Sequence, residues 1–199
     1  MTASETASIL LTDNKQAAET ATSKDGIIDQ ILKNLQILPV EEIQFYHLLP
    51  LYTFFQMIDI DKKRLILDKG VMNMMKSFLN SVCEIVLVHV TYIIYQIFYL
   101  ESADVQEQVQ NQLRIGVQKD GIITKLIKIF NNETYSNIKI NQHIALSIGF
   151  LFKAAQIPDE FGNLIIAQLE ELACKMNSTL SIFALLALDY LAECQCMLQ

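Results

Sequence analysis

The pentapeptide Lys-Asp-Gly-Ile-Ile stands at residues 24–28 and returns unchanged at residues 119–123. Weaker copies, Asp-Lys-Gly-Val-Met and Phe-Gly-Asn-Leu-Ile, stand at residues 68–72 and 161–165. Along the chain, the glycines of successive copies are 44, 51 and 41 residues apart. Each glycine precedes a short apolar-periodic segment and then a longer, more hydrophobic one. Repeats of roughly 40–47 residues with two or three helices are typical of an α-solenoid.

Apolar residues recur at steps of three and four throughout these segments, which predicts helices. Pro39 should end one helix and start the next, because the residue before a proline avoids the helical region. Pro50 should kink the helix that contains it, and Ser178 should cap the last one. The expected helices cover residues 26–38, 39–58, 61–67, 71–79, 82–100, 105–117, 122–130, 138–156, 159–161, 163–176 and 178–198.

The segments group into four expected repeats, preceded by an arm at residues 1–23 that is rich in Ala, Ser and Thr. The repeats cover about 24–58, 59–100, 104–156 and 158–199. The predicted fold class is all-α, a right-handed superhelical solenoid whose core is a continuous stack rather than one centre.

The composition excludes some classes of protein. At 52% hydrophobic and 19% charged residues, the chain is not of a disordered type. With a net charge of −7, the chain lacks the positively charged surface that nucleic acid binding needs. Residues 85–100 carry no formal charge and include polar side chains, but they are fewer than the roughly 20 of a membrane span. A buried helix explains that segment better.

No basic region followed by an apolar run opens the chain, so we expect no secretory signal. Four cysteines without a signal indicate reduced thiols, in the cytoplasm or the nucleus. The Cys-Gln-Cys at residues 194–196 could form half of a metal site, but the other ligands are missing. We therefore expect no metal and no other cofactor.

The order of short helix, glycine, medium helix and long helix resembles the armadillo repeat of eukaryotic intracellular proteins. That family turns sharply at the glycine, and its third helix carries a pattern of small apolar residues. The last repeat fits best, with Ala184, Ala187-Leu188 and Tyr190-Leu191. The resemblance covers about residues 24–199 and implies a concave groove, lined by third helices, that binds extended peptides.

In the nuclear-import branch of this family, the groove bears Trp and, four residues later, Asn. The matching pairs here are Tyr92 with Gln96, Leu146 with Phe150, and Leu186 with Tyr190. This chain has no Trp and no Asn at those positions. The departure argues against a receptor for basic localisation signals.

Gln96, Phe150 and Tyr190 each lie 26–29 residues after the glycine of their repeat, and Phe54 lies at the same distance after Gly26. Each of the three histidines lies seven residues before one of these groove positions. Seven residues are about two helical turns, so each pair shares a face. The histidines could be ordinary packing residues, partner contacts or a pH switch, whereas a shared zinc does not suit helices about 8–10 Å apart. The expected partner-binding residues are His47, Phe54, His89, Tyr92, Gln96, His143, Phe150 and Tyr190.

The sequence contains no Gly-x-Gly-x-x-Gly or Gly-x4-Gly-Lys-Ser/Thr phosphate-binding loop. It also contains no Gly-x-Ser-x-Gly nucleophile motif. We therefore expect no enzyme, but a protein–protein interaction scaffold that holds a peptide or a helix along the third-helix groove. An alternative is a self-associating assembly subunit that uses an apolar C-terminal end. That end contains Leu180, Leu185, Leu188, Leu191 and Met197.

Overall fold

The structure, a computed structural model, describes residues 26–57, 63, 66, 69–103, 107–175 and 178–194. These residues form nine α-helices and one short 3-10 helix and contain no strand, so the all-α class is confirmed for them. The chain divides into two compact units, residues 1–100 and 101–199. The expected arm at residues 1–23 and most of the expected helix at 61–67 lie outside the described residues.

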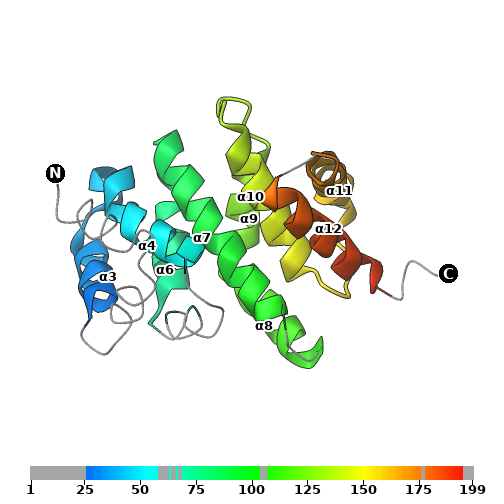
Figure 1. The fold of residues 1–199 in the computed structure, drawn as a ribbon, viewed down its shortest axis with the longest axis horizontal. Helices are drawn as coiled ribbons and strands as arrows, with labels where there is room; N and C mark the ends of the chain where they lie inside the picture. Colours follow the sequence, from blue (N-terminus) through cyan, green and yellow to red (C-terminus); the bar gives the residue numbers. More distant parts are fainter. Residues whose placement is uncertain are drawn as a thin grey trace. The chain divides into compact units, whose positions relative to one another are not determined.

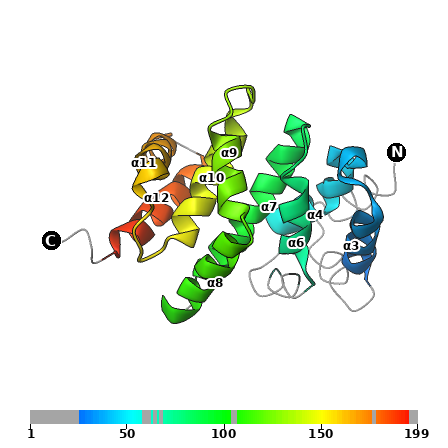
Figure 2. The same cartoon turned by 180° about the vertical axis from the view of Figure 1, so that it is seen from behind.

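The first unit begins with α3, which covers Ile27–Ile37 and ends just before Leu38-Pro39 as the sequence predicts. Its buried residues form one stripe of Ile28, Ile31, Leu32 and Leu35, which packs against α4 and α6. Figures 1 and 2 show α3 beside these two helices. Lys69 ties the turn before α6 to this helix through an ion pair with Asp29.

The helix expected over residues 39–58 is broken in two, which corrects that prediction. A 3-10 helix, η1, covers Val40–Glu42, and α4 covers Phe45–Met57 with Pro50 inside it. Between them Ile43 is extended, with φ −67° and ψ 121°, and its side chain is almost fully buried. The burial of Ile43 thus coincides with a two-residue break between η1 and α4.

Two further helices are described in the first unit. The shorter, α6, covers Val71–Phe78 and the longer, α7, covers Glu84–Ser102, close to their expected bounds. By length and composition α7 could span a membrane, yet 78% of its most apolar window is buried inside the structure. That burial is consistent with the core helix of a soluble protein.

The second unit is arranged around α10, which covers Ile138–Leu151. It packs against α8 (Glu107–Lys119), α9 (Ile122–Phe130), α11 (Asp159–Ala173) and α12 (Thr179–Ala192). Both cartoon views show α11 and α12 side by side next to α10 (Figures 1 and 2). Eleven of the 14 residues of α10 are buried.

The repeated glycines adopt two kinds of backbone conformation. Gly70 and Gly121 have positive φ, +78° and +71°, and each precedes a helix start, as a sharp turn requires. Gly26 is instead extended, and Gly162 lies inside α11. The separate helices expected at 159–161 and 163–176 are therefore one helix, and that prediction was wrong.

Two other helix ends differ from expectation. α10 stops at Leu151 rather than at residue 156. Beyond its end, Ala154 takes a positive φ of 53° and its N–H donates to the Tyr190 carbonyl at 2.9 Å. α12 begins after Ser178 as predicted, but the Ser178 side chain makes no capping bond. Its carbonyl accepts a hydrogen bond from the Ser181 hydroxyl instead.

Candidate functional site

Aromatic side chains of α4 and α7 meet at the surface of the first unit. The His89 ring lies 4.8 Å from Tyr52 and 6.3 Å from Phe45, measured between ring centroids. Tyr52 also lies 4.3 Å from Tyr92. Phe45 is exposed, and so is Ile85, one turn before His89 on the same helix. We call Phe45, Tyr52, Ile85 and His89 the α4–α7 aromatic surface.

The two histidines of this unit carry their protons on different nitrogens. His89 Nδ1 lies 2.7 Å from the Ile85 carbonyl oxygen. A carbonyl can only accept, so Nδ1 of His89 bears a proton. His47 Nδ1 accepts from the Gln44 N–H at 3.0 Å, so its proton resides on Nε2. Burial lowers the pKa of His47, and the neutral ring caps the start of α4 through its bond with the Gln44 N–H.

Three other expected contact residues of the first unit are buried. Phe54 is fully buried, and Tyr92 and Gln96 are nearly so. Gln96 accepts a hydrogen bond from the Lys63 ammonium at 3.0 Å. Burial raises the pKa of Tyr92, so its phenol stays protonated at neutral pH. These three side chains therefore pack in the core of the first unit, and their role as partner contacts stays a prediction.

In the second unit the expected residues divide in the same way. Phe150 is fully buried and meets Phe183 and Tyr190 edge to face, and His143 is also buried. Tyr190 is half-buried, and the Lys153 ammonium lies 4.0 Å from the centre of its ring. Of the expected set, His47, His89 and Tyr190 reach the surface, and the other five side chains are buried. The partner-binding role of the set stays a prediction.

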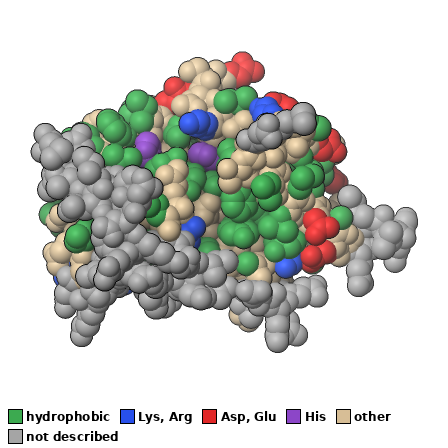
Figure 3. All heavy atoms as spheres, in the orientation of Figure 1, with side chains coloured by type: hydrophobic (Ala, Val, Ile, Leu, Met, Phe, Trp, Pro, Cys, Tyr) green, Lys and Arg blue, Asp and Glu red, His purple; other side chains and the backbone are tan. Residues whose placement is uncertain are grey.

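The outer face of α12 exposes apolar side chains. Eleven of its 14 residues are apolar, yet only Ala184, Ala187 and Leu191 are buried. Ile182 is 68% exposed and Leu185 57%. Hydrophobic side chains form a broad patch over this helix (Figure 3). We call Ile182, Leu185 and the half-buried Leu186 the α12 apolar face.

Two acidic residues continue that face towards the C-terminal end of the helix. Asp189 lies seven residues after Ile182 and Glu193 four residues further, so both follow the same helical stripe. Both are exposed. Residues 179–193 contain no Lys or Arg. The stripe therefore changes from apolar to acidic along its length.

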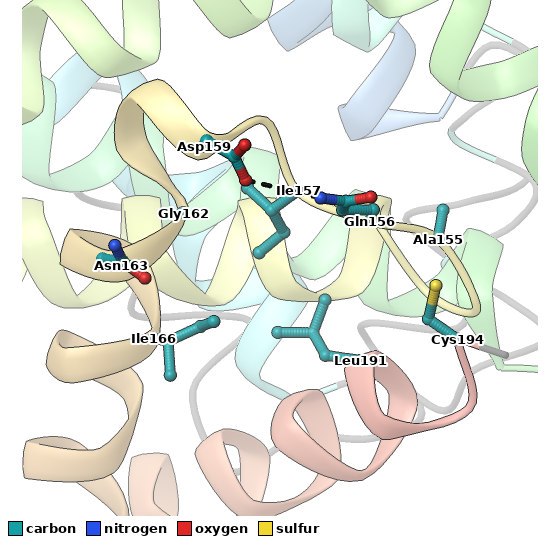
Figure 4. Close-up of a pocket in the computed structure, with 9 residues that line it drawn as sticks. All are labelled: Ala155, Gln156, Ile157, Asp159, Gly162, Asn163, Ile166, Leu191 and Cys194. Carbon is teal, nitrogen blue, oxygen red and sulfur yellow. Dashed lines mark hydrogen bonds between the residues drawn. The ribbon is translucent and has the colours of Figure 1, made fainter. Parts of the chain in front are cut away.

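A cavity of about 160 Å³ lies between the start of α11, the end of α12 and the loop that precedes α11. Ile157, Ile166 and Leu191 point into it, with the Cys194 thiol at one side (Figure 4). Gln156, Asp159 and Asn163 supply polar groups. No sequence pattern indicates this pocket, because its residues come from two stretches, 155–166 and 191–194, and share no spacing that marks them.

The described residues contain no group of three or more His, Cys, Asp or Glu side chains that could hold a metal ion. Cys194 is buried, and the other two residues of its Cys-Gln-Cys lie outside the described part of the chain. Comparison with models of known protein families and with curated proteins finds no match to this sequence.

Proposed function

We propose that this chain is a non-enzymatic interaction module of armadillo-like design, and that α12 docks a helix of a partner protein. The single observation that carries the proposal is the contrast between α10 and α12. The two helices have the same length and α12 is the more apolar, with 11 apolar residues against eight in α10. Yet most of α10 is buried, whereas α12 buries only Ala184, Ala187 and Leu191. Exposed apolar patches of this kind mark interaction sites in soluble proteins.

The left-handed glycines support the armadillo-like design. Gly70 and Gly121 stand where that family turns sharply between its first two helices. The small residues of the expected third-helix pattern, Ala184 and Ala187, are fully buried where α12 packs on its neighbours. The superhelical stack of four repeats remains part of the proposal.

The stripe on α12 defines the chemistry of its partner. An amphipathic helix would lay its apolar residues on Ile182, Leu185 and Leu186, as in helix-in-groove recognition. One or two turns further it would bring Lys or Arg beside Asp189 and Glu193. The charged pairs at the rim contribute mainly to orientation and rate of association, and the buried apolar area supplies most of the affinity.

Self-association of the chain is the second candidate, because the same uncovered face could be buried against a second copy. An isologous dimer would place α12 against α12. However, each copy carries a net charge of −7, and the two copies repel. Analytical ultracentrifugation at micromolar concentration distinguishes the two candidates. If the wild type is a dimer and Ile182→Gln/Leu185→Gln is a monomer, the chain self-associates through α12 and the partner-helix proposal is removed.

The experiment for partner binding is a crosslinking capture from cells, read by quantitative mass spectrometry. The test variant is Ile182→Gln/Leu185→Gln. The matched control is Ile138→Gln/Leu164→Gln, because both side chains are 54% exposed and belong to the same unit. We expect partners that the control keeps and the test variant loses, with the helical content of both unchanged.

A third variant, Phe45→Ala/His89→Ala, tests the α4–α7 aromatic surface in the same capture. Loss of a different set of partners would make this surface a second binding site. If the α12 variant and the control retain identical partners, α12 is not the docking helix and the proposal fails.

A further inference from the structure

The pocket between α11 and α12 combines an apolar interior with a polar edge. Ile157, Leu191 and Cys194 are nearly fully buried, so the interior is built by side chains fixed in the core. Asp159, Gln156 and Asn163 are exposed and stand at the opening. Figure 4 shows the three aliphatic side chains converging on the space, with the Asp159 carboxylate beyond them.

The volume limits the occupant to a single side chain. A cavity of about 150 Å³ lined by aliphatic residues accommodates one benzene molecule, and this one measures about 160 Å³. Cofactor and drug-sized sites are roughly 300–1,000 Å³. A nucleotide or an organic cofactor therefore does not fit, whereas one long side chain does.

The charge of the lining decides which side chain. Among the described residues that line the pocket, Asp159 is the one charged residue, and none is Lys, Arg or His. Its bond from Gln156 Nε2 is 3.4 Å long, which leaves the carboxylate able to accept stronger donors. The nearby exposed residues Glu160 and Glu193 add negative charge.

We infer that this pocket takes the side chain of a lysine or arginine from a partner protein. The aliphatic stem would lie on Ile157, Ile166 and Leu191, as such stems do along apolar surfaces. The cationic head would meet Asp159, with amide oxygens of Gln156 and Asn163 as further acceptors. Arginine suits the carboxylate best, because its planar guanidinium can donate two parallel bonds.

The inference rests on the proposed function only for the source of the side chain, and its test needs no partner. Small probes replace the side chain: n-butylguanidinium, the neutral n-butylurea of similar shape, and the anion pentanoate. Each is titrated against the full chain with labelled Ile and Leu methyl groups. We expect n-butylguanidinium to shift the methyl signals of Ile157, Ile166 and Leu191, n-butylurea to bind about fivefold more weakly, and pentanoate to bind least.

Two variants assign the charge preference to one residue. Asp159→Asn should weaken n-butylguanidinium binding by about fivefold and leave n-butylurea unchanged. Glu160→Gln removes a charge from the same first turn of α11 without lining the pocket, so it should preserve most of the preference. Circular dichroism checks that both variants keep their helices.

The inference fails if no probe shifts the pocket methyls, or if the three probes bind equally. It also fails if Glu160→Gln abolishes the preference for n-butylguanidinium over n-butylurea as fully as Asp159→Asn does. The selectivity would then come from the overall negative charge of the protein and not from Asp159. The outcome is separable from that of the α12 experiment, because Ile182 and Leu185 do not line the pocket. Their methyl signals serve as the internal reference.

Discussion

Gly149 of α10 lies directly against Ala187 of α12. A methyl group built on Gly149 would stand 2.8 Å from the Ala187 Cβ and 3.2 Å from a methyl carbon of Leu169. Real Cβ atoms do not approach so closely, so the absence of a side chain at residue 149 sets how near the two helices come. The position is also fully enclosed, since both residues are buried.

We predict that Gly149→Ala lowers the melting temperature. Overpacking costs about 1–3 kcal/mol, which exceeds the roughly 1 kcal/mol that alanine gains over glycine in a helix. The control is Gly116→Ala in α8, where nothing lies within 4 Å of the added methyl, and it should raise the melting temperature. Equal stabilisation by both changes would contradict the close contact. Ala187→Gly should partly rescue Gly149→Ala.

We predict that the cap made by His47 gives stability a pH dependence. The ring accepts the Gln44 N–H only when neutral, and burial holds its folded pKa below the ordinary 6.5. As pH falls below about 6.5, the unfolded chain therefore binds more protons at this residue than the folded chain, and the unfolding free energy decreases. The loss continues until the pH passes the folded pKa.

His47→Gln is the variant that tests this dependence. Glutamine at the third helical position can reach back to the same N–H through its amide oxygen, as in a capping box, but it does not titrate. We expect its unfolding free energy, followed by urea denaturation between pH 7.5 and 5, to fall less than that of the wild type. Identical slopes for the two proteins would remove His47 as the cause.

The left-handed turn at Gly121 should be sensitive to any side chain. Gly121→Ala meets no neighbouring atom. Its cost is therefore the backbone strain alone, about 1–2 kcal/mol. Gly162→Ala should be neutral or stabilising, because that glycine is helical and the new methyl makes ordinary contacts at 3.5 Å. Thermal unfolding of both variants measures the contrast. Equal effects would mean that the two glycines have the same role.

Gln110 should be needed to end α10. Its buried amide donates to the carbonyls of Phe150 and Leu151 at 3.0 and 3.2 Å, while its Oε1 is buried with no hydrogen-bond partner among the described residues. Gln110→Glu replaces the donor by a carboxylate facing two carbonyls, and we expect a loss of at least about 1–3 kcal/mol. Gln110→Met, which also removes the unpartnered oxygen, should cost less. The reverse order in urea denaturation would contradict this account.

Helix positions could be predicted where a local signal decides them. The stripe of α3 and the turns at Gly70 and Gly121 depend on periodicity and on a backbone that glycine favours. The break before α4 coincides instead with the burial of Ile43, and the last carbonyls of α10 accept hydrogen bonds from α8, some 40 residues earlier in the chain. Tertiary partners of that kind leave no local trace in the sequence.

The candidate site was harder to predict than the fold, because core and surface positions look alike on an apolar helix. Phe54 and Phe150 hold the expected groove positions yet are fully buried, whereas Tyr190 is half-buried at the corresponding position. α12 is more apolar than α10, yet fewer of its residues are buried. What covers each helix depends on its neighbours in space, which the sequence does not reveal.

The sparse anchoring of α12 has a kinetic consequence. With three buried residues against eleven in α10, α12 should open more often, and local opening exposes whatever lies beneath it. Cys194 follows α12 directly and is buried, whereas Cys174, just after α11, is exposed. An alkylating reagent should therefore label Cys174 at once and Cys194 only as fast as the end of α12 detaches. The ratio of the two labelling rates therefore measures how often the helix end opens. A partner bound to α12 should lower the labelling rate of Cys194 and leave that of Cys174 unchanged.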